Sequence, residues 1–520
     1  MTEGGQGRRE DHEKRLLGHV KHAVDSLKVL NTIDENKLVL RSTISGKPAI
    51  ERMQARKQIS PLRFSSIEVA TLWHPPQVGL IRNSALVVSR KSPPPRNLPS
   101  KKGDPQISFF AVTNHRDRFI PFGIKRFDRR LHSYIVGKSG SGKSCLLQLL
   151  IKNDIDSGHG LALLDPHGDL ADRVMRLIPE YRLKDVVIFD PADANFPPAF
   201  NPMSAVRPDL KVRVTLSLID AFKRVFGVDW SDKMDHVLRY ATMAMLAVPG
   251  ASVSTLRRFL SDSEYRAAIL ERTGDEAIRR FWQQEYPSRQ AEFDGGVIAP
   301  ILNRFDQLLS SSLINNILGQ PKNLFDFRSF MDSRKIVLMK ISKGTLGVEN
   351  ATLLGSLLIS KIYEAAMSRA DIPQEQRQDF YFYIDEFQNF ANESFGEILS
   401  ESRKYRLNLT MANQFLGQLS SEVRQTIFGN VGNLLAFRVG SEDAGALAKE
   451  FSPRAGVEDI LNLGFRDFYL KMSIDGQVLD AFSGRTIDVP VPAEDASTAE
   501  RVREVSRELY CQRVGTLQAV

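Results

Sequence analysis

The chain has 520 residues, of which 42% are hydrophobic and 25% are charged, and its formal net charge is +8. This composition excludes a disordered or collagen-like chain, and the length predicts two to four domains or one large domain with insertions. Two cysteines, Cys145 and Cys511, are too few for a disulfide framework or a cysteine metal site, so a reducing, cytoplasmic compartment fits best. The positive charge favours an anionic partner such as nucleic acid.

The first 105 residues predict a helical extension and a connection. Residues 1–58 mix charged and apolar residues at helical spacing. Residues 59–105 hold one short helical pattern and a proline-rich run, which predict an extended lead-in segment. The polar start differs from a signal peptide, and no apolar stretch is as long as a membrane span, so we expect no transmembrane segment.

From about residue 106, short apolar runs alternate with helical patterns, which is typical of an α/β fold. Near-continuous apolar runs predict a mostly parallel sheet buried on both faces, in a core formed by residues 106–200 and 331–490. The predicted strands are 133–136, 161–165, 186–190, 335–341, 380–385, 407–412 and 433–439.

Two other segments have their own patterns. Residues 201–330 lack strand patterns and carry apolar residues at helical spacing, which predicts an all-α insertion domain inside the core. Near the end, residues 466–486 predict a hairpin with Asp475 and Gly476 at its turn, and residues 491–520 predict a C-terminal helix.

The strongest motif is GKSGSGKS, which lies between a predicted strand and a predicted helix and fits the phosphate-binding loop pattern. Its glycines let the backbone N–H groups face a phosphate chain, and the following helix adds its positive end. Lys143 is expected to reach the β- and γ-phosphates of ATP, and the Ser144 hydroxyl to bind Mg²⁺. The alternative is a glycine-rich turn that matches by chance. The predicted nucleotide-binding residues of the loop are Gly137, Lys138, Ser139, Gly140, Ser141, Gly142, Lys143 and Ser144.

A second motif, FYFYIDEFQNF, places two acids directly after a predicted strand. An acid in this position of a phosphate-loop ATPase holds Mg²⁺, and a neighbouring glutamate polarises the attacking water. We therefore assign Asp385 to Mg²⁺ and Glu386 to the water. The alternative is a strand end capped by two solvated acids, which is the commoner case for such a pair in isolation.

Three further features accompany these motifs. Gln414 follows the next strand, where an amide can sense the γ-phosphate, although a polar loop residue is the alternative. Arg403 is the candidate for an arginine finger that reaches a neighbouring subunit, with Arg406 and Arg438 as competitors and a solvated basic helix end as the alternative. In LLDPHGDL, His167 and Asp169 suggest a metal or acid–base pair, but we interpret the turn as shaping the nucleotide pocket, with Asp165 able to contact water or Mg²⁺.

Taken together, IVGKSGSGKS, LLDPHGDL, YIDEFQNF, SRKYRLNLTMANQ and GNLLAFRVGSEDA resemble the FtsK–HerA superfamily of hexameric DNA motors, and within it the TraD/TraG-type coupling proteins of conjugative type IV secretion. The resemblance covers about residues 60–485. It implies a RecA-like core, a homohexameric ring with ATP between subunits, DNA in the central channel, and the site roles given above. It also implies relaxosome and secretion-system partners. Many coupling proteins begin with transmembrane helices, and this sequence shows none, so docking at the inner membrane would depend on a partner.

The leading hypothesis is a ring ATPase that translocates DNA during conjugative transfer. Three alternatives remain: a HerA-like DNA motor outside secretion, a related secretion ATPase that acts on protein, and a non-enzymatic adaptor that binds nucleotide. DNA stimulation of the ATPase separates a DNA motor from a protein motor, and turnover separates both from an adaptor.

Overall fold

The structure, a computed structural model, describes residues 89–116, 118–204, 207–227, 230–391, 395–489 and 496–513, and also residues 48, 51 and 55. Apart from those three positions, the predicted helical extension and the first part of the lead-in lie outside the described residues. The division of the chain into domains stays a prediction.

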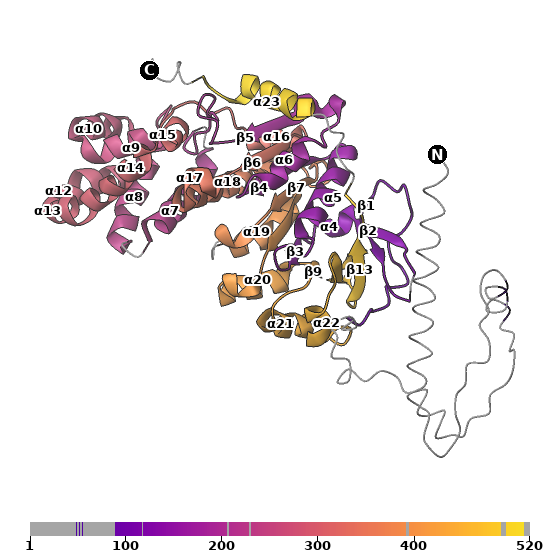
Figure 1. The fold of residues 1–520 in the computed structure, drawn as a ribbon. Helices are drawn as coiled ribbons and strands as arrows, with labels where there is room; N and C mark the ends of the chain where they lie inside the picture. The colour runs from indigo at the N-terminus through magenta and orange to yellow at the C-terminus, as the bar shows by residue number, and fades with distance from the viewer. Residues whose placement is uncertain are drawn as a thin grey trace, which may run out of the picture. The chain divides into compact units, whose positions relative to one another are not determined.

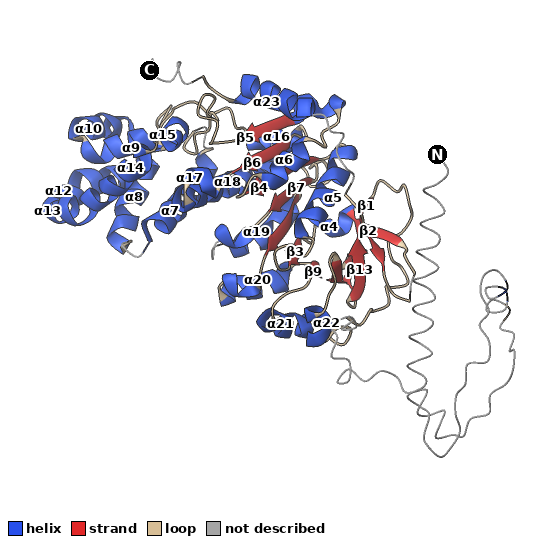
Figure 2. Ribbon diagram, in the orientation of Figure 1, coloured by secondary structure: helices blue, strands red, loops and turns tan. Residues whose placement is uncertain are grey.

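A large mixed sheet forms the centre of the fold (Figures 1 and 2). Within the described residues it has eleven strands in the order β2-β1-β13-β10-β9-β3-β8-β7-β4-β6-β5. The strands from β9 to β5 in this order are all parallel to one another. Strands β2, β1, β13 and β10 extend the sheet beyond β9 by antiparallel pairing. The strands are β1 (Ile107–Thr113), β2 (Pro121–Lys125), β3 (Ser133–Val136), β4 (Gly160–Asp165), β5 (Val186–Phe189), β6 (Ile336–Lys340), β7 (Phe380–Ile384), β8 (Leu407–Asn413), β9 (Asn433–Ala436), β10 (Asp467–Lys471) and β13 (Phe482–Thr486).

The expected fold class, an α/β core with a mostly parallel sheet, is confirmed. Each predicted strand has a counterpart whose bounds differ by at most three residues. The predicted hairpin turn is also present, because β11 (Ser473–Ile474) pairs with β12 (Gln477–Val478) around Asp475 and Gly476, both of which have positive φ. Strands β1 and β2 were missed, because their run is broken by polar residues and lies beside the proline-rich lead-in.

Both faces of the sheet are buried, as the near-continuous apolar runs predict. In β4, Leu161 and Leu163 join one hydrophobic cluster, while Ala162 and Leu164 join the other. The first cluster also holds apolar residues of α5 and α6, and the second holds those of α18 and the helical region. Helices that cover the sheet or follow its strands are α4 (Arg126–Arg129), α5 (Lys143–Asp156), α6 (Asp169–Met175), α16 (Phe327–Asp332), α17 (Lys343–Leu346), α18 (Val348–Ser368), α19 (Phe395–Glu401), α20 (Ser421–Asn430), α21 (Ser441–Phe451) and α22 (Val457–Leu461).

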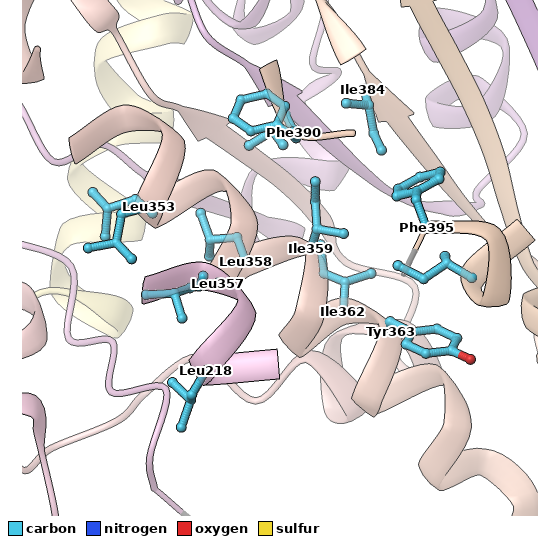
Figure 3. Packing of buried hydrophobic residues seen from close by; sticks show 14 of the residues in the cluster. Leu218, Leu353, Leu357, Leu358, Ile359, Ile362, Tyr363, Ile384, Phe390 and Phe395 are labelled. Atoms are coloured by element: carbon cyan, nitrogen blue, oxygen red, sulfur yellow. The ribbon is translucent and has the colours of Figure 1, made fainter. Parts of the chain in front are cut away.

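Between β5 and β6 the chain forms the helical region, which extends away from the sheet in Figure 1. Its α-helices are α7 (Lys211–Phe226), α8 (Asp232–Met245), α9 (Val253–Ser261), α10 (Ser263–Arg272), α11 (Glu276–Arg280), α12 (Tyr286–Ser288), α13 (Gln290–Phe293), α14 (Ala299–Ser310) and α15 (Ser312–Leu318). Figure 3 shows Leu218 of α7 near Leu357 of α18. Phe390 and Phe395 lie on the other side of α18 and belong to the same hydrophobic cluster. One hydrophobic cluster therefore runs from the helical region to the sheet.

The C-terminal helix α23 (Ala496–Tyr510) lies beside β5, the edge strand at the parallel end of the sheet (Figure 1). The N–H of Ile188 in β5 donates a hydrogen bond of 2.8 Å to the buried Ser506 Oγ. An edge strand leaves backbone groups unpaired, and α23 covers this edge and satisfies one of them.

Candidate nucleotide-binding site

The phosphate-binding loop joins β3 to α5, as the motif predicts. Gly140 and Gly142 have φ values of +73° and +124°, which L side chains rarely adopt. A Cβ atom on Gly142 would also lie 3.3 Å from Cα of Arg466. The loop is attached to both neighbours of β3, since Gly137 N donates to Asn413 O at 3.3 Å and Lys138 N donates to Arg438 O at 2.9 Å. The loop geometry therefore depends on strands that are almost 300 residues away in sequence.

Lys143 is buried at the first position of α5. Its ammonium donates hydrogen bonds to the carbonyl oxygens of Gly137 at 2.5 Å and Lys138 at 3.3 Å. Burial lowers the pKa of Lys143, while the carboxylates of Glu386 and Asp385 act in the opposite direction. The lysine is thus held between the loop and the acidic pair, where a phosphate chain in the loop would meet it.

Asp385 and Glu386 follow the last residue of β7 and are 8% and 7% exposed. Asp385 N donates to Leu164 O at 3.0 Å, which continues the pairing of β7 with β4. Burial, followed by the nearby carboxylates of Asp165 and Glu386, raises the pKa of Asp385 to about 6. Glu386 has a φ of +46°, an uncommon conformation for a residue with a side chain and one that is frequent at functional sites.

Two amides hold the carboxylate of Glu386. Gln414 Nε2 donates to Oε1 at 2.9 Å, and Gln388 Nε2 donates to Oε2 at 2.5 Å. The structure therefore brings Gln414 to Glu386, and its role in sensing the γ-phosphate stays a prediction. Gln388 was missed, although it lies two residues after Glu386 in the same motif. Its Oε1 is buried and has no hydrogen-bond partner among the described residues.

Asp165 ends β4 and is 1% exposed. Its two oxygens accept hydrogen bonds from His167 N at 2.9 Å and from Ala171 N at 3.0 Å. The carboxylate thus fixes the turn before α6, in line with the interpretation that this turn shapes the pocket. Each oxygen keeps a second lone pair, so the expected contact with water or Mg²⁺ stays a prediction.

These groups share one cavity of about 380 Å³ at the carboxyl edge of the parallel strands. That edge is where ligands bind in open α/β sheets. Its lining residues are Ser139, Gly140, Gly142, Lys143, Ser144, Cys145, Asp165, His167, Asp169, Leu170, Arg173, Asp385, Glu386, Gln414 and Phe465. Of the predicted site residues, Gly137, Lys138, Ser141 and Arg403 are not in this lining.

The donor set fits Mg²⁺. Ser144 and Asp385 both line the cavity and offer hard oxygen ligands. Among the described residues, no group of three or more His, Cys, Asp or Glu side chains could hold a metal ion. Mg²⁺ is typically bound by one or two protein ligands with phosphate and water completing the shell, which this pair matches.

Of the three candidate arginines, Arg403 and Arg406 lie at the amino end of β8, and Arg438 lies beside the phosphate loop. Arg403 is exposed and lies just before the amino end of β8, in a short 3₁₀ helix formed by residues Ser402–Tyr405. The seven residues of β8 span about 20 Å, and the carboxyl end of this strand adjoins the phosphate loop. Arg403 is therefore remote from its own cavity. Arg406 Nε contacts Gln374 O at 3.4 Å on the same edge, whereas Arg438 is exposed beside the loop of its own chain.

A buried ionic network holds the C-terminal part of α5, the helix that follows the phosphate-binding loop. Asp154 of α5 pairs with Arg126 at 2.8 Å and Arg129 at 2.6 Å, and its carboxylate also accepts a hydrogen bond from the Tyr383 hydroxyl of β7. Arg126 and Arg129, two of the four basic residues in 125–130, are therefore buried in the interior. The network ties the helix of the phosphate loop to the strand that ends in Asp385 and Glu386.

Within the described part of the chain, no helix combines the length and hydropathy that crossing a membrane requires.

Two family models match the chain. The model for the central domain of the helicase HerA matches residues 122–346, and the model for the TraM recognition site of TraD and TraG matches residues 379–464. Together they contain the phosphate loop, the acidic pair, Gln414 and Arg403. A search of curated proteins gives no match.

Many solved structures have a similar fold, among them the following three. The bacterial conjugative coupling protein TrwB in its unbound ΔN70 form is 16% identical with a TM-score of 0.53, and the match covers 72% of this chain and 88% of that one. The plasmid coupling protein TrwB in complex with ADP and Mg²⁺ is also 16% identical with a TM-score of 0.53, and the match covers 72% of this chain and 90% of that one. VirB4 of Thermoanaerobacter pseudethanolicus is 13% identical with a TM-score of 0.53, and the match covers 74% of this chain and 97% of that one.

The motifs, the fold and the two family models agree, and the chain belongs to the FtsK–HerA superfamily of P-loop ATPases, among the TraD/TraG-type proteins.

Proposed function

We propose that the protein is a ring-forming motor that hydrolyses Mg–ATP to translocate DNA, in conjugative transfer through a type IV secretion system. The observation that carries the catalytic part is the single cavity that joins Lys143, Asp385, Glu386 and Gln414. The match to the TraM recognition site of TraD and TraG and the likeness to TrwB, a conjugative coupling protein, support the transfer role.

In the proposed reaction, Lys143 and the loop bind the phosphates, while Ser144 and Asp385 hold Mg²⁺. Mg²⁺ supplies charge neutralisation on the phosphate oxygens. Glu386 orients the attacking water and polarises it, and ADP and inorganic phosphate leave. Loss of the γ-phosphate would be transmitted through Gln414, because its amide is bonded directly to Glu386.

Arg403 is the proposed trans-acting arginine of a homohexamer. Its distance from its own cavity supports action on a neighbour, since it lies at the opposite edge of the sheet. We propose a cytoplasmic location, peripheral at the inner membrane through partners of the secretion system and the relaxosome.

The direct test measures ATP hydrolysis by the full chain with and without double- and single-stranded DNA, with the mass of the assembly determined on the same sample. We expect hydrolysis that DNA stimulates, in a hexameric species. DNA binding should weaken steeply with salt, because phosphate counterions are released. Hydrolysis without any response to DNA at low salt would instead favour a protein cargo, and tight ATP binding without turnover would favour an adaptor.

A further inference from the structure

An exposed aromatic ring stands at the rim of the nucleotide cavity. Phe465 lies between α22 and β10, and it is 62% exposed although it lines the cavity formed by the loop and the acidic pair. The exposure of a single large apolar side chain is common on protein surfaces, so exposure by itself indicates nothing. The position beside the phosphate loop distinguishes Phe465 from other exposed apolar side chains.

The backbone holds Phe465 in a fixed relation to the phosphate loop. Arg466 N donates to Ser141 O at 3.0 Å, and Cα of Arg466 approaches Gly142 so closely that the glycine has little room for a side chain. Arg466 itself has a φ of +64°, and its carbonyl accepts a hydrogen bond from Thr486 N at 3.1 Å. The chain therefore adopts an uncommon conformation where it places the ring beside the loop.

The side chain of Arg466 supports one side of the ring. Its guanidinium lies over Phe465 at 5.2 Å from the ring centroid and forms an ion pair with Asp488. Nε of Arg466 is buried and has no hydrogen-bond partner among the described residues. One face of the ring thus meets the guanidinium, which leaves the opposite face for a flat apolar ligand.

The lining of the cavity combines two kinds of chemistry. Lys143 and the loop suit phosphates, and the exposed Phe465 provides an aromatic face. A nucleotide also combines these two features, because it carries a phosphate chain and the π-face of its base. We propose that Phe465 is the stacking platform for the purine base of the bound nucleotide, and that Arg466 positions its ring. This proposal rests on the proposed nucleotide-binding function and adds the base-binding residue to it.

The proposal predicts a selective loss of affinity. Base–aromatic stacking measured by substitution corresponds to about a 5-fold to 150-fold change in affinity for each base. The full-length Phe465→Leu protein should therefore bind Mg–ADP about 5-fold to 150-fold more weakly in calorimetric titrations. Its affinity for magnesium tripolyphosphate, which has the phosphates but no base, should stay unchanged. GDP should lose affinity by a similar factor, because every purine offers a π-face.

Two variants sharpen the test. Phe465→Trp keeps an aromatic face and should restore ADP affinity, whereas Phe119→Leu, at an equally exposed phenylalanine outside the cavity, should change nothing. An unchanged ADP affinity in Phe465→Leu overturns the stacking role, and so does an equal loss for ADP and tripolyphosphate, which would mean that the ring shapes the loop. Wild-type protein that binds neither ligand would contradict the proposed function as well as this inference.

Discussion

The side-chain amide of Gln414 donates a hydrogen bond of 2.9 Å to Oε1 of Glu386. The two residues are 28 positions apart and follow neighbouring parallel strands, β8 and β7. The carboxyl ends of adjacent parallel strands lie at one edge of the sheet, which brings the proposed sensor against the proposed water-polarising group. Gln388 occupies the second carboxylate oxygen, so both oxygens of Glu386 are bonded to amides.

Replacing Glu386 by Gln should separate binding from hydrolysis. The variant keeps the size of the side chain but loses the carboxylate that polarises water, so we expect kcat to fall by about 10²- to 10⁴-fold. ATP affinity should stay within about threefold of wild type, because the phosphates are bound by the loop. Steady-state hydrolysis and equilibrium ATP binding measure the two effects. Glu397→Gln, at an exposed glutamate of α19, is the matched control, and normal turnover in Glu386→Gln would refute the assignment.

Replacing Gln414 by Ala should lower kcat with little change in KM. The hydrogen bond from Gln414 orients the carboxylate of Glu386. Loss of one such bond to a charged group should lower kcat by about tenfold to hundredfold. Comparison of kcat and KM with those of Gln290→Ala, in the helical region, checks this effect. A rise in KM with kcat retained would instead make Gln414 a residue that only binds ATP.

Arg403 and Lys143 should complement each other across subunits. Lys143→Ala removes the phosphate-binding ammonium and Arg403→Ala removes the proposed trans-acting cation, so each variant alone should lose most of its hydrolysis. In mixed rings, an intact loop from the Arg403→Ala subunit meets an intact arginine from the Lys143→Ala subunit. ATPase assays across mixing ratios should show activity above that of either variant. Activity that never exceeds the average of the two variants would contradict a shared site. A mixture of Arg438→Ala with Lys143→Ala tests Arg438 as the competing trans-acting arginine.

The pKa of Asp385 predicts two pH effects. Its folded-state value of about 6 lies above its ordinary value of 3.8, so the folded protein binds the proton more tightly than the unfolded chain does. The contribution of Asp385 to stability is therefore lost as pH rises from about 4 through 6. Urea unfolding at pH 4.5 and 7.5 should show Asp385→Asn gaining up to about 3 kcal/mol over wild type, mainly at the higher pH.

The ionisation of Asp385 should also control the binding of Mg²⁺. A carboxylate must lose its proton to bind the ion, so the Mg²⁺-dependent gain in ADP affinity should rise between pH 5 and 7 and level off above the pKa. Titrations of ADP with and without Mg²⁺ across this range measure it. A gain that is flat with pH would show that Asp385 is not a Mg²⁺ ligand or that its pKa is ordinary.

Ser506 should stabilise the fold without acting at the cavity. Removing its hydroxyl leaves the N–H of Ile188 buried without its acceptor, which costs about 1–3 kcal/mol. Thermal and urea unfolding of Ser506→Ala should show this loss, while ADP affinity at a temperature where the protein is folded stays unchanged. Ser400→Ala, on the exposed face of α19, should lose less than about 0.5 kcal/mol. Equal stability of the two variants would show that α23 adds little to the edge of the sheet.

Strands β1 and β2 and the position of Phe465 at the nucleotide cavity were not predicted from the sequence. Phe465 follows the phosphate loop by more than 300 residues, and its only local signals are an ordinary Gly-Phe-Arg run and the start of the predicted hairpin. Gln388 was equally hidden, because a glutamine after an acidic pair is unremarkable until the left-handed turn at Glu386 folds it back.

The sequence by itself determined the phosphate loop, the acidic pair, the parallel strands and the helical region, since each depends on local spacing: glycines that allow positive φ, apolar runs of strand length, and a 3.6-residue period. Only the tertiary structure decided which side chains meet. Asp165, Glu386, Gln414 and Phe465 come together because the order of strands in the sheet differs from their order in the chain. Hydrogen bonding between strands sets that order, and contacts between residues hundreds of positions apart leave no periodic trace in the sequence.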